Sequence, residues 1–181
     1  MTRVLILFFI FSFELFVNAQ NENINLLPDE NFPLWLKTEQ TRTNQTSGIA
    51  FIKSECDKKY FLLADDIGAI HLLTLKSDSI FSIEKILFAD SIDHYFSNFP
   101  KMDFEEIAYD KRNGNVFLSV EGNGENFNEY VGIYKLIFNE NDVLSKKIIS
   151  IEKITYEPTS LFYKHTARNI GYEAFALDDN Y

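Results

Sequence analysis

Five acidic residues of this chain stand where carboxylates from separate strands would converge. Glu105 and Glu173 hold the same position in a repeated motif, and Asp103 lies two residues before Glu105, on the same face of the expected strand. Asp66 and Glu121 come at the end of the next strand of their repeats. Converging carboxylates repel one another until a cation neutralises them, and their oxygens suit Ca²⁺ or Mg²⁺ better than Zn²⁺. The set therefore predicts a calcium site. The alternative is that these carboxylates cap strand ends and accept backbone hydrogen bonds in turns.

Residues for covalent or acid–base catalysis are harder to assign. The sequence contains neither a Gly-x-Ser-x-Gly nucleophile motif nor a His-Glu-x-x-His zinc motif. Its three histidines, His71, His94 and His165, are scattered, and we interpret them as surface or structural residues. Because Cys56 is the one cysteine, an internal disulfide is excluded. It falls in a polar stretch that predicts a hairpin turn. No catalytic residue is assigned.

Short apolar runs separated by turn residues must position these side chains. Phe and Tyr are abundant, with 18 and 9 residues, and such side chains favour half-buried strands over helices. Turn signals such as Asn113-Gly114 separate the runs. Strands are predicted at 48–52, 60–64, 69–75, 80–88, 104–109, 115–120, 130–138 and 147–154, and only 90–102 is expected to hold a helical turn.

The predicted strands form a repeat. The segments that recur are Ser-Gly-Ile-Ala-Phe at 47–51, Glu-Glu-Ile-Ala-Tyr at 105–109 and Glu-Ala-Phe-Ala-Leu at 173–177. Each of the first two is followed by three more strands, and antiparallel four-stranded units in tandem are typical of β-propeller blades. A β-sandwich, the alternative, would not require the strand order to recur. We therefore expect an all-β protein with a partial β-propeller domain at 47–181.

The number of repeats has a consequence for completeness. Two complete units and the first strand of a third account for the sequence up to Tyr181. A propeller closes its ring with about four to eight blades. The chain is therefore expected to be an N-terminal fragment holding about two and a quarter blades.

The motifs resemble those of a known family. Asp-Phe-Glu-Glu-Ile-Ala at 103–108, Phe-Leu-Ser-Val-Glu at 117–121 and Asn-Ile-Gly-Tyr-Glu-Ala-Phe-Ala at 169–176 are similar to the pattern of the phytase-like propellers labelled "esterase-like activity of phytase". The opening Ser-Gly-Ile also resembles the SdiA-regulated propeller family. The chain departs from the pattern at Glu106 and Ala174, where the family has glycine.

This resemblance implies two functions that the residues leave open. The first is a calcium-dependent hydrolase of phosphoric or carboxylic esters, with Glu105, Glu121 and Glu173 as the principal channel carboxylates. The second is a non-catalytic propeller that binds a ligand or partner and uses calcium structurally. In either case a small molecule or phosphate ester is the expected ligand. An anionic ester would need calcium to bridge it to the carboxylates.

The net charge bears on the partner of the protein, and the first residues indicate its compartment. The formal net charge of −10 disfavours nucleic acid as a partner. Residues 1–19 read as a secretory signal peptide, with Arg3 before an apolar run and cleavage expected after Ala19. The run is too short for a stable membrane span. The protein is thus expected to be secreted or periplasmic, with residues 20–46 as a polar lead-in to the propeller.

Overall fold

The computed structural model describes part of the chain. The described residues are 41, 43, 45–77, 80–98, 103–123, 130–154, 169–170, 172 and 174–178. Contacts divide the chain into two units, Met1–Leu34 and Trp35–Tyr181, and every described residue belongs to the second. The predicted signal peptide, most of the lead-in segment and Glu173 therefore lie outside the described residues.

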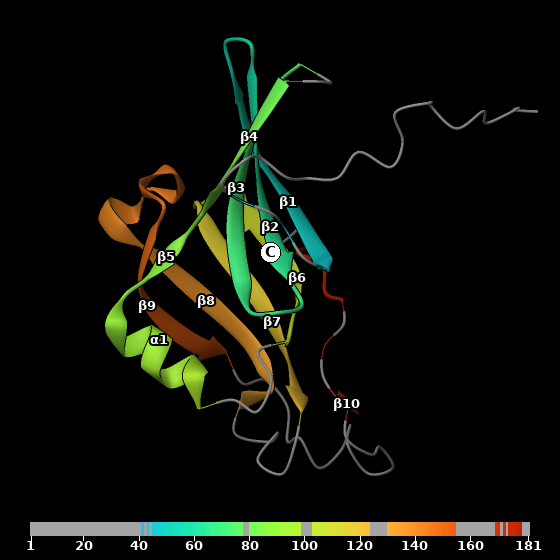
Figure 1. The fold of residues 1–181 in the computed structure, drawn as a ribbon, viewed down its shortest axis with the longest axis vertical. Helices are drawn as coiled ribbons and strands as arrows, with labels where there is room; N and C mark the ends of the chain where they lie inside the picture. The colour runs from blue at the N-terminus through green and yellow to red at the C-terminus, as the bar shows by residue number, and fades with distance from the viewer. Residues whose placement is uncertain are drawn as a thin grey trace, which may run out of the picture. The chain divides into compact units, whose positions relative to one another are not determined.

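The first sheet is built from four consecutive strands. They pair antiparallel in the order β1-β2-β3-β4 and appear cyan to green in Figure 1. Their turns use residues at positive φ, with Cys56 between β1 and β2 and Gly68 between β2 and β3. The strands are β1 (Thr46–Glu55), β2 (Lys58–Asp65), β3 (Ala69–Ser77) and β4 (Ile80–Lys85).

The second sheet repeats this order and extends it. Strands β6, β7, β8 and β9 pair antiparallel with their neighbours in sequence, while β5 adds parallel to β9 and β10 pairs with the end of β7. The bounds are β5 (Leu87–Phe88), β6 (Asp103–Asp110), β7 (Asn115–Asn123), β8 (Gly132–Phe138), β9 (Lys147–Ile154) and β10 (Asn169–Ile170). Two short 3₁₀ turns, Asn139–Asn141 and Val143–Ser145, connect β8 to β9.

The connection between the two sheets differs from the prediction. A single strand was expected over 80–88, but it is broken at Ile86, whose side chain is buried and whose N–H donates to the Ile70 carbonyl at 2.8 Å. The Leu87 N–H then donates to the Lys146 carbonyl of the second sheet at 2.9 Å. The chain changes sheets here because burying Ile86 in the shared core turns the following residues toward β9.

One helix, α1 (Asp90–Ser97), lies within the region where a helical turn was predicted. Its buried residues, Ile92 and Phe96, are four apart and so share one face. The Phe96 ring packs against Phe104 and Tyr134 with centroids 5.2 and 5.9 Å apart. The helix thereby covers the second sheet beside β5 and β9 (Figure 1). No helix in the described part of the chain is long and apolar enough to cross a membrane.

The main core lies between the sheets. Alternate residues of β1 to β3 contribute Ala50, Leu62 and Ile70, and the second sheet contributes Ile107 and Leu118, all at most 6% exposed. The first strands of the two sheets, β1 and β6, approach closely at Gly48, where a Cβ would lie 2.7 Å from the Glu105 carbonyl oxygen and from the Ile107 nitrogen. Only a residue without a side chain fits this contact, and β1 and β6 can pack together because glycine stands there.

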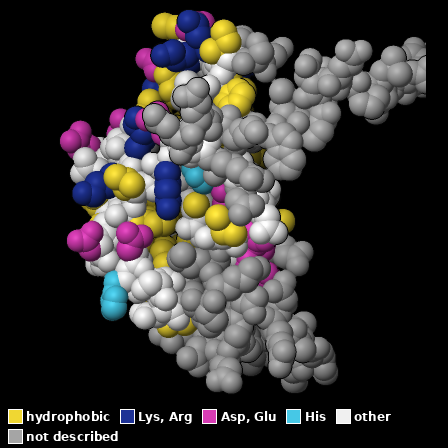
Figure 2. All heavy atoms as spheres, viewed as in Figure 1, with side chains coloured by type: hydrophobic (Ala, Val, Ile, Leu, Met, Phe, Trp, Pro, Cys, Tyr) yellow, Lys and Arg dark blue, Asp and Glu magenta, His cyan; other side chains and the backbone are white. Residues whose placement is uncertain are grey.

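The described fold confirms the all-β prediction and the positions of most strands. Each sheet contains four consecutive antiparallel strands, as the repeat predicts. On the face shown in Figure 2, the described basic and acidic side chains are interspersed, with hydrophobic side chains between them.

Candidate metal centre

Three of the predicted carboxylates meet where the two sheets face each other. One oxygen each of Asp66, Asp103 and Glu105 lies within 4.8 Å of the others. Asp103 is fully buried, and the other two are partly exposed. Asp66 follows β2 of the first sheet, whereas the other two belong to β6, so the group joins residues from both sheets.

A β-bulge in β6 shapes the second-sheet side of this group. The β6–β7 register shifts between Phe104 and Ile107, which leaves Glu105 and Glu106 outside the regular ladder. The freed Glu106 N–H donates to the hydroxyl of buried Ser119 at 2.9 Å, and the Ile107 N–H donates to the Glu106 carboxylate at 3.0 Å. These bonds give both N–H groups an acceptor and stabilise the bulge that carries Glu105.

A tight turn shapes the first-sheet side. The Gly68 N–H donates to the Asp65 carbonyl at 2.9 Å, and the positive φ of Gly68 allows the chain to reverse at once. The Asp66 N–H donates to the Gln45 carbonyl at 3.0 Å, which ties the turn to the start of β1. Asp66 is thus held against β6, and the close approach at Gly48 brings β1 against the backbone of Glu105.

The other two predicted ligands have different outcomes. Glu121 pairs in register with Asp103 across β6 and β7 and is 4% exposed, but it is not one of the three carboxylates that meet. Glu173 falls outside the described residues.

A second polar group, which the sequence did not reveal, lies in the first sheet. Asp65 is fully buried and accepts a hydrogen bond from the Thr46 hydroxyl at 2.9 Å. His71, 3% exposed, places Nδ1 3.4 Å from the second Asp65 oxygen. Burial lowers the pKa of His71 below its usual value, although Asp65 opposes this and Lys85 adds to it. In the sequence, His71 is only a polar residue within an apolar strand, and this pattern does not show whether its side chain is buried or exposed.

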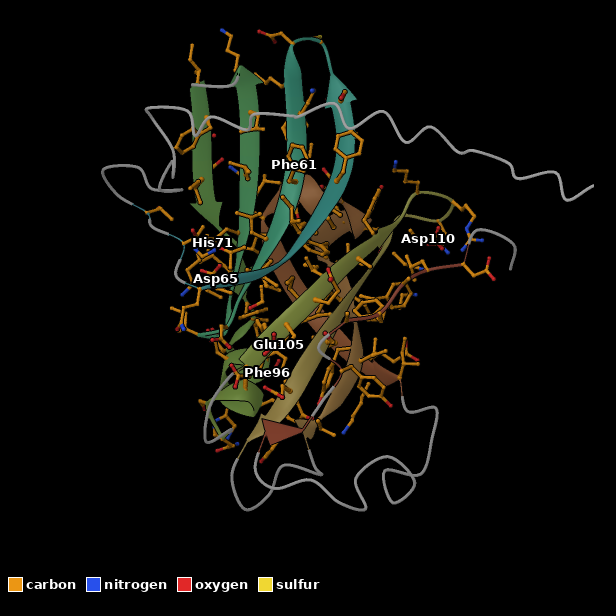
Figure 3. The ribbon with its side chains drawn as sticks, turned by 90° about the vertical axis from the view of Figure 1, so that its right-hand side faces the viewer. Phe61, Asp65, His71, Phe96, Glu105 and Asp110 are labelled. Carbon is orange, nitrogen blue, oxygen red and sulfur yellow. The ribbon has the colours of Figure 1, made fainter. Side chains whose placement is uncertain are left out.

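The position of these residues is seen in Figure 3. Asp65 and His71 lie next to each other at the lower end of the first sheet, and Glu105 is on the same side of the molecule. Asp110 lies at the opposite end of β6, where side-chain and backbone hydrogen bonds from Arg112 lower the pKa of its carboxyl. The charge of Asp110 is therefore balanced by the Arg112 guanidinium of the following turn.

The chemistry of the three-carboxylate group is that of an oxygen-ligand cation site. Ionised carboxylates within 4.8 Å of one another repel, and water screens this repulsion least at Asp103, which is buried. A calcium ion takes about six to eight oxygen ligands, which three carboxylates and water at the exposed side can supply. The donor set contains no sulfur or imidazole, so zinc is a poorer match.

Three comparisons with known proteins found no match. A scan against protein-family models found no match to this chain, and neither did searches of curated proteins and of solved structures. The resemblance to phytase-like propellers rests on the motifs of the chain itself.

Proposed function

We propose that this chain forms the first blades of an exported, phytase-like β-propeller that binds calcium through Asp66, Asp103 and Glu105. The observation that carries the proposal is the convergence of these carboxylates, from two sheets, within 4.8 Å. A cation held there would connect the two sheets and offset the repulsion among the three charges.

The arrangement of the repeats supports the propeller part of the proposal. The two sheets have the same order of four strands, and their first strands, β1 and β6, pack against each other. Leu177, in the third copy of the motif, lines one cavity with Ala108 and Tyr109 of β6. The packing of β1 on β6, and the position of Leu177 beside β6, support the order expected along a propeller channel.

Two activities follow from a calcium ion at this place. Bound calcium would bridge the carboxylates to an oxygen of a phosphoric or carboxylic ester and polarise the ester for attack by water, which releases the alcohol, so the protein would be a hydrolase. In the second candidate the ion only stabilises the packing of the sheets, and the protein binds a ligand or partner. The position of the three carboxylates between two sheets supports the binding protein as much as the hydrolase.

Calcium titration tests the site. The purified protein is titrated with Ca²⁺ by calorimetry and melted with and without the ion. We expect binding and a rise in the melting temperature for the wild type. Glu105→Gln should weaken binding by at least about tenfold, the loss that even outer-ligand changes cause. Glu152→Gln, at an exposed glutamate of β9, is the matched control and should bind like the wild type.

Assays on phytate and simple aryl esters, with and without calcium, separate the two activities. Turnover that Glu105→Gln abolishes supports the hydrolase, and calcium-dependent melting without turnover supports the binding module. No heat of binding and no change in melting temperature would exclude the calcium site. N-terminal sequencing of the exported protein tests the signal peptide, whose cleavage after Ala19 should leave Gln20 first.

A further inference from the structure

A cavity of about 330 Å³ lies between α1 and the second half of β9. It shares no residue with the three-carboxylate group. Ser91, Ile92 and Tyr95 line it from the helix, where residues three and four apart share one face. Residues 149–151 and Lys153 line it from the strand. Because Ser91 is exposed and Tyr95 and Lys153 are partly exposed, the cavity opens to solvent.

A β-bulge in β9 forms the strand side of the cavity. The β8–β9 register shifts so that Ile149 is an extra residue, and its side chain is 43% exposed. After the bulge, Ile151 and Lys153 pair with Leu136 and Tyr134 of β8. Paired residues of neighbouring strands share a face, and both β8 residues belong to the core between the sheets. The cavity therefore lies on the face of the second sheet that is directed toward the first sheet.

Lys153 is the one charged side chain among the described residues that line the cavity. Its stem lies over Gly132, where a Cβ would be only 2.9 Å from the lysine Cε. Its Nζ lies 5.9 Å from the ring centroid of buried Tyr134, a cation–π contact. Glycine leaves room for the stem and the ring attracts the ammonium group, so the positive charge is held at the cavity. Such a charge favours a carboxylate ligand.

A chain of hydroxyl groups fixes the aromatic wall of the cavity. The Tyr134 hydroxyl donates to the Tyr130 carbonyl at 2.6 Å. A phenol has one proton to donate, so Tyr95 is the donor across the 3.2 Å between the Tyr95 and Tyr134 hydroxyl oxygens. The Tyr95 ring also packs edge-on against Tyr130, with centroids 5.8 Å apart. Because these contacts fix Tyr95 before a ligand arrives, binding costs less conformational entropy.

We propose that this cavity binds a small aromatic carboxylic acid, with its ring between Tyr95 and Ile151 and its carboxylate at the Lys153 ammonium group. A cavity of about 150 Å³ holds one benzene molecule, so about 330 Å³ accommodates a ring with a short acidic side chain. The hydroxyls of Ser91 and Ser150 line the same cavity and are donors for a second carboxylate oxygen. The inference goes beyond the proposed calcium site and uses none of its residues.

Calorimetric titration with phenylacetate tests the cavity. Wild type should bind phenylacetate and should bind acetate and 2-phenylethylamine more weakly, because acetate lacks the ring and the amine replaces the carboxylate with a cation. Lys153→Met should weaken phenylacetate binding by about tenfold or more, the loss expected for one charge-assisted hydrogen bond. Lys153→Arg keeps the charge and should keep most of the affinity.

Lys147→Met is the matched control, because Lys147 is an exposed residue of the same strand and does not line the cavity. It removes the same charge and should bind phenylacetate like the wild type. Circular dichroism checks the fold of each variant, and if Lys153→Met does not fold, the order of the three probes on the wild type decides.

A wild type that binds no phenylacetate, or binds 2-phenylethylamine equally well, overturns the proposal. An equal loss in Lys147→Met also overturns it, because net charge and not the cavity would then attract the anion. A protein that binds Ca²⁺ but not phenylacetate would refute this inference and leave the proposed function standing.

Discussion

The first and second repeats differ most in what surrounds equivalent residues. Gly48 is pressed against the backbone of β6, whereas Glu106, its equivalent, has a side chain that bonds to the next N–H of its own strand. Ile49 is mostly exposed and Ile107 is buried. The same short motif thus makes a tight contact in β1 and a bulge in β6. What each position contributes to stability therefore depends on the neighbouring sheet and not on the motif.

The third strands of the two repeats differ at one buried position. Leu63 pairs with Ile49 and His71 in the first sheet, and Leu118 pairs with Ile107 and Tyr134 in the second, so Tyr134 of β8 is the counterpart of His71 of β3. His71 is 3% exposed beside Asp65, whereas Tyr134 is fully buried in the core between the sheets and donates its hydroxyl to the Tyr130 carbonyl at 2.6 Å. Each buried polar side chain has a polar group of its own sheet beside it.

The comparison of the isoleucines predicts the largest effect. Ile107→Ala should lower the free energy of unfolding by about 2–5 kcal/mol, because it leaves a cavity in the shared core. Ile49→Ala should cost under about 0.5 kcal/mol, because the side chain is exposed. Urea unfolding at low protein concentration measures both. Equal losses would contradict the packing of β6 on the first sheet.

Gly48 predicts a smaller effect with the same origin. Gly48→Ala should cost about 1–3 kcal/mol, since its Cβ would meet backbone atoms of β6 that cannot move without repacking. Glu106→Ala, at the equivalent position, should cost about 1 kcal/mol because it removes only one hydrogen bond. Thermal melts of the two variants give the order. If Glu106→Ala proves the more damaging, the close approach of β1 to β6 is wrong.

His71 predicts the smallest effect, a pH dependence. Its pKa is lower in the folded protein than in the unfolded chain, so the unfolded state binds more protons as pH falls below about 6.5. Stability should therefore decline from there toward the folded-state pKa, and His71→Asn should reduce this decline. Melting temperatures between pH 7.5 and pH 5 measure it, with His94→Asn, at an exposed histidine of α1, as the control. A pH profile that is unchanged by His71→Asn would refute the assignment.

Much of the fold followed from local patterns. Short apolar runs bounded by turn residues located the strands, because both signals are local properties of the sequence. Asn113-Gly114 marked the turn between β6 and β7, where Gly114 has a positive φ. A helical turn was also predicted within 90–102, where α1 lies. The break at Ile86 was not, because burying that side chain needs the core of the second sheet.

The sequence by itself determined the strands, the repeat and the candidate carboxylates, because each depends on residue types and their spacing. Only the tertiary structure decided that Asp66 meets Asp103 and Glu105 while Glu121 stays outside the group, and that Asp65 and His71 are buried together. These outcomes depend on the β-bulge in β6 and on the contact at Gly48, which bring two sheets together across a gap in sequence that no local pattern encodes.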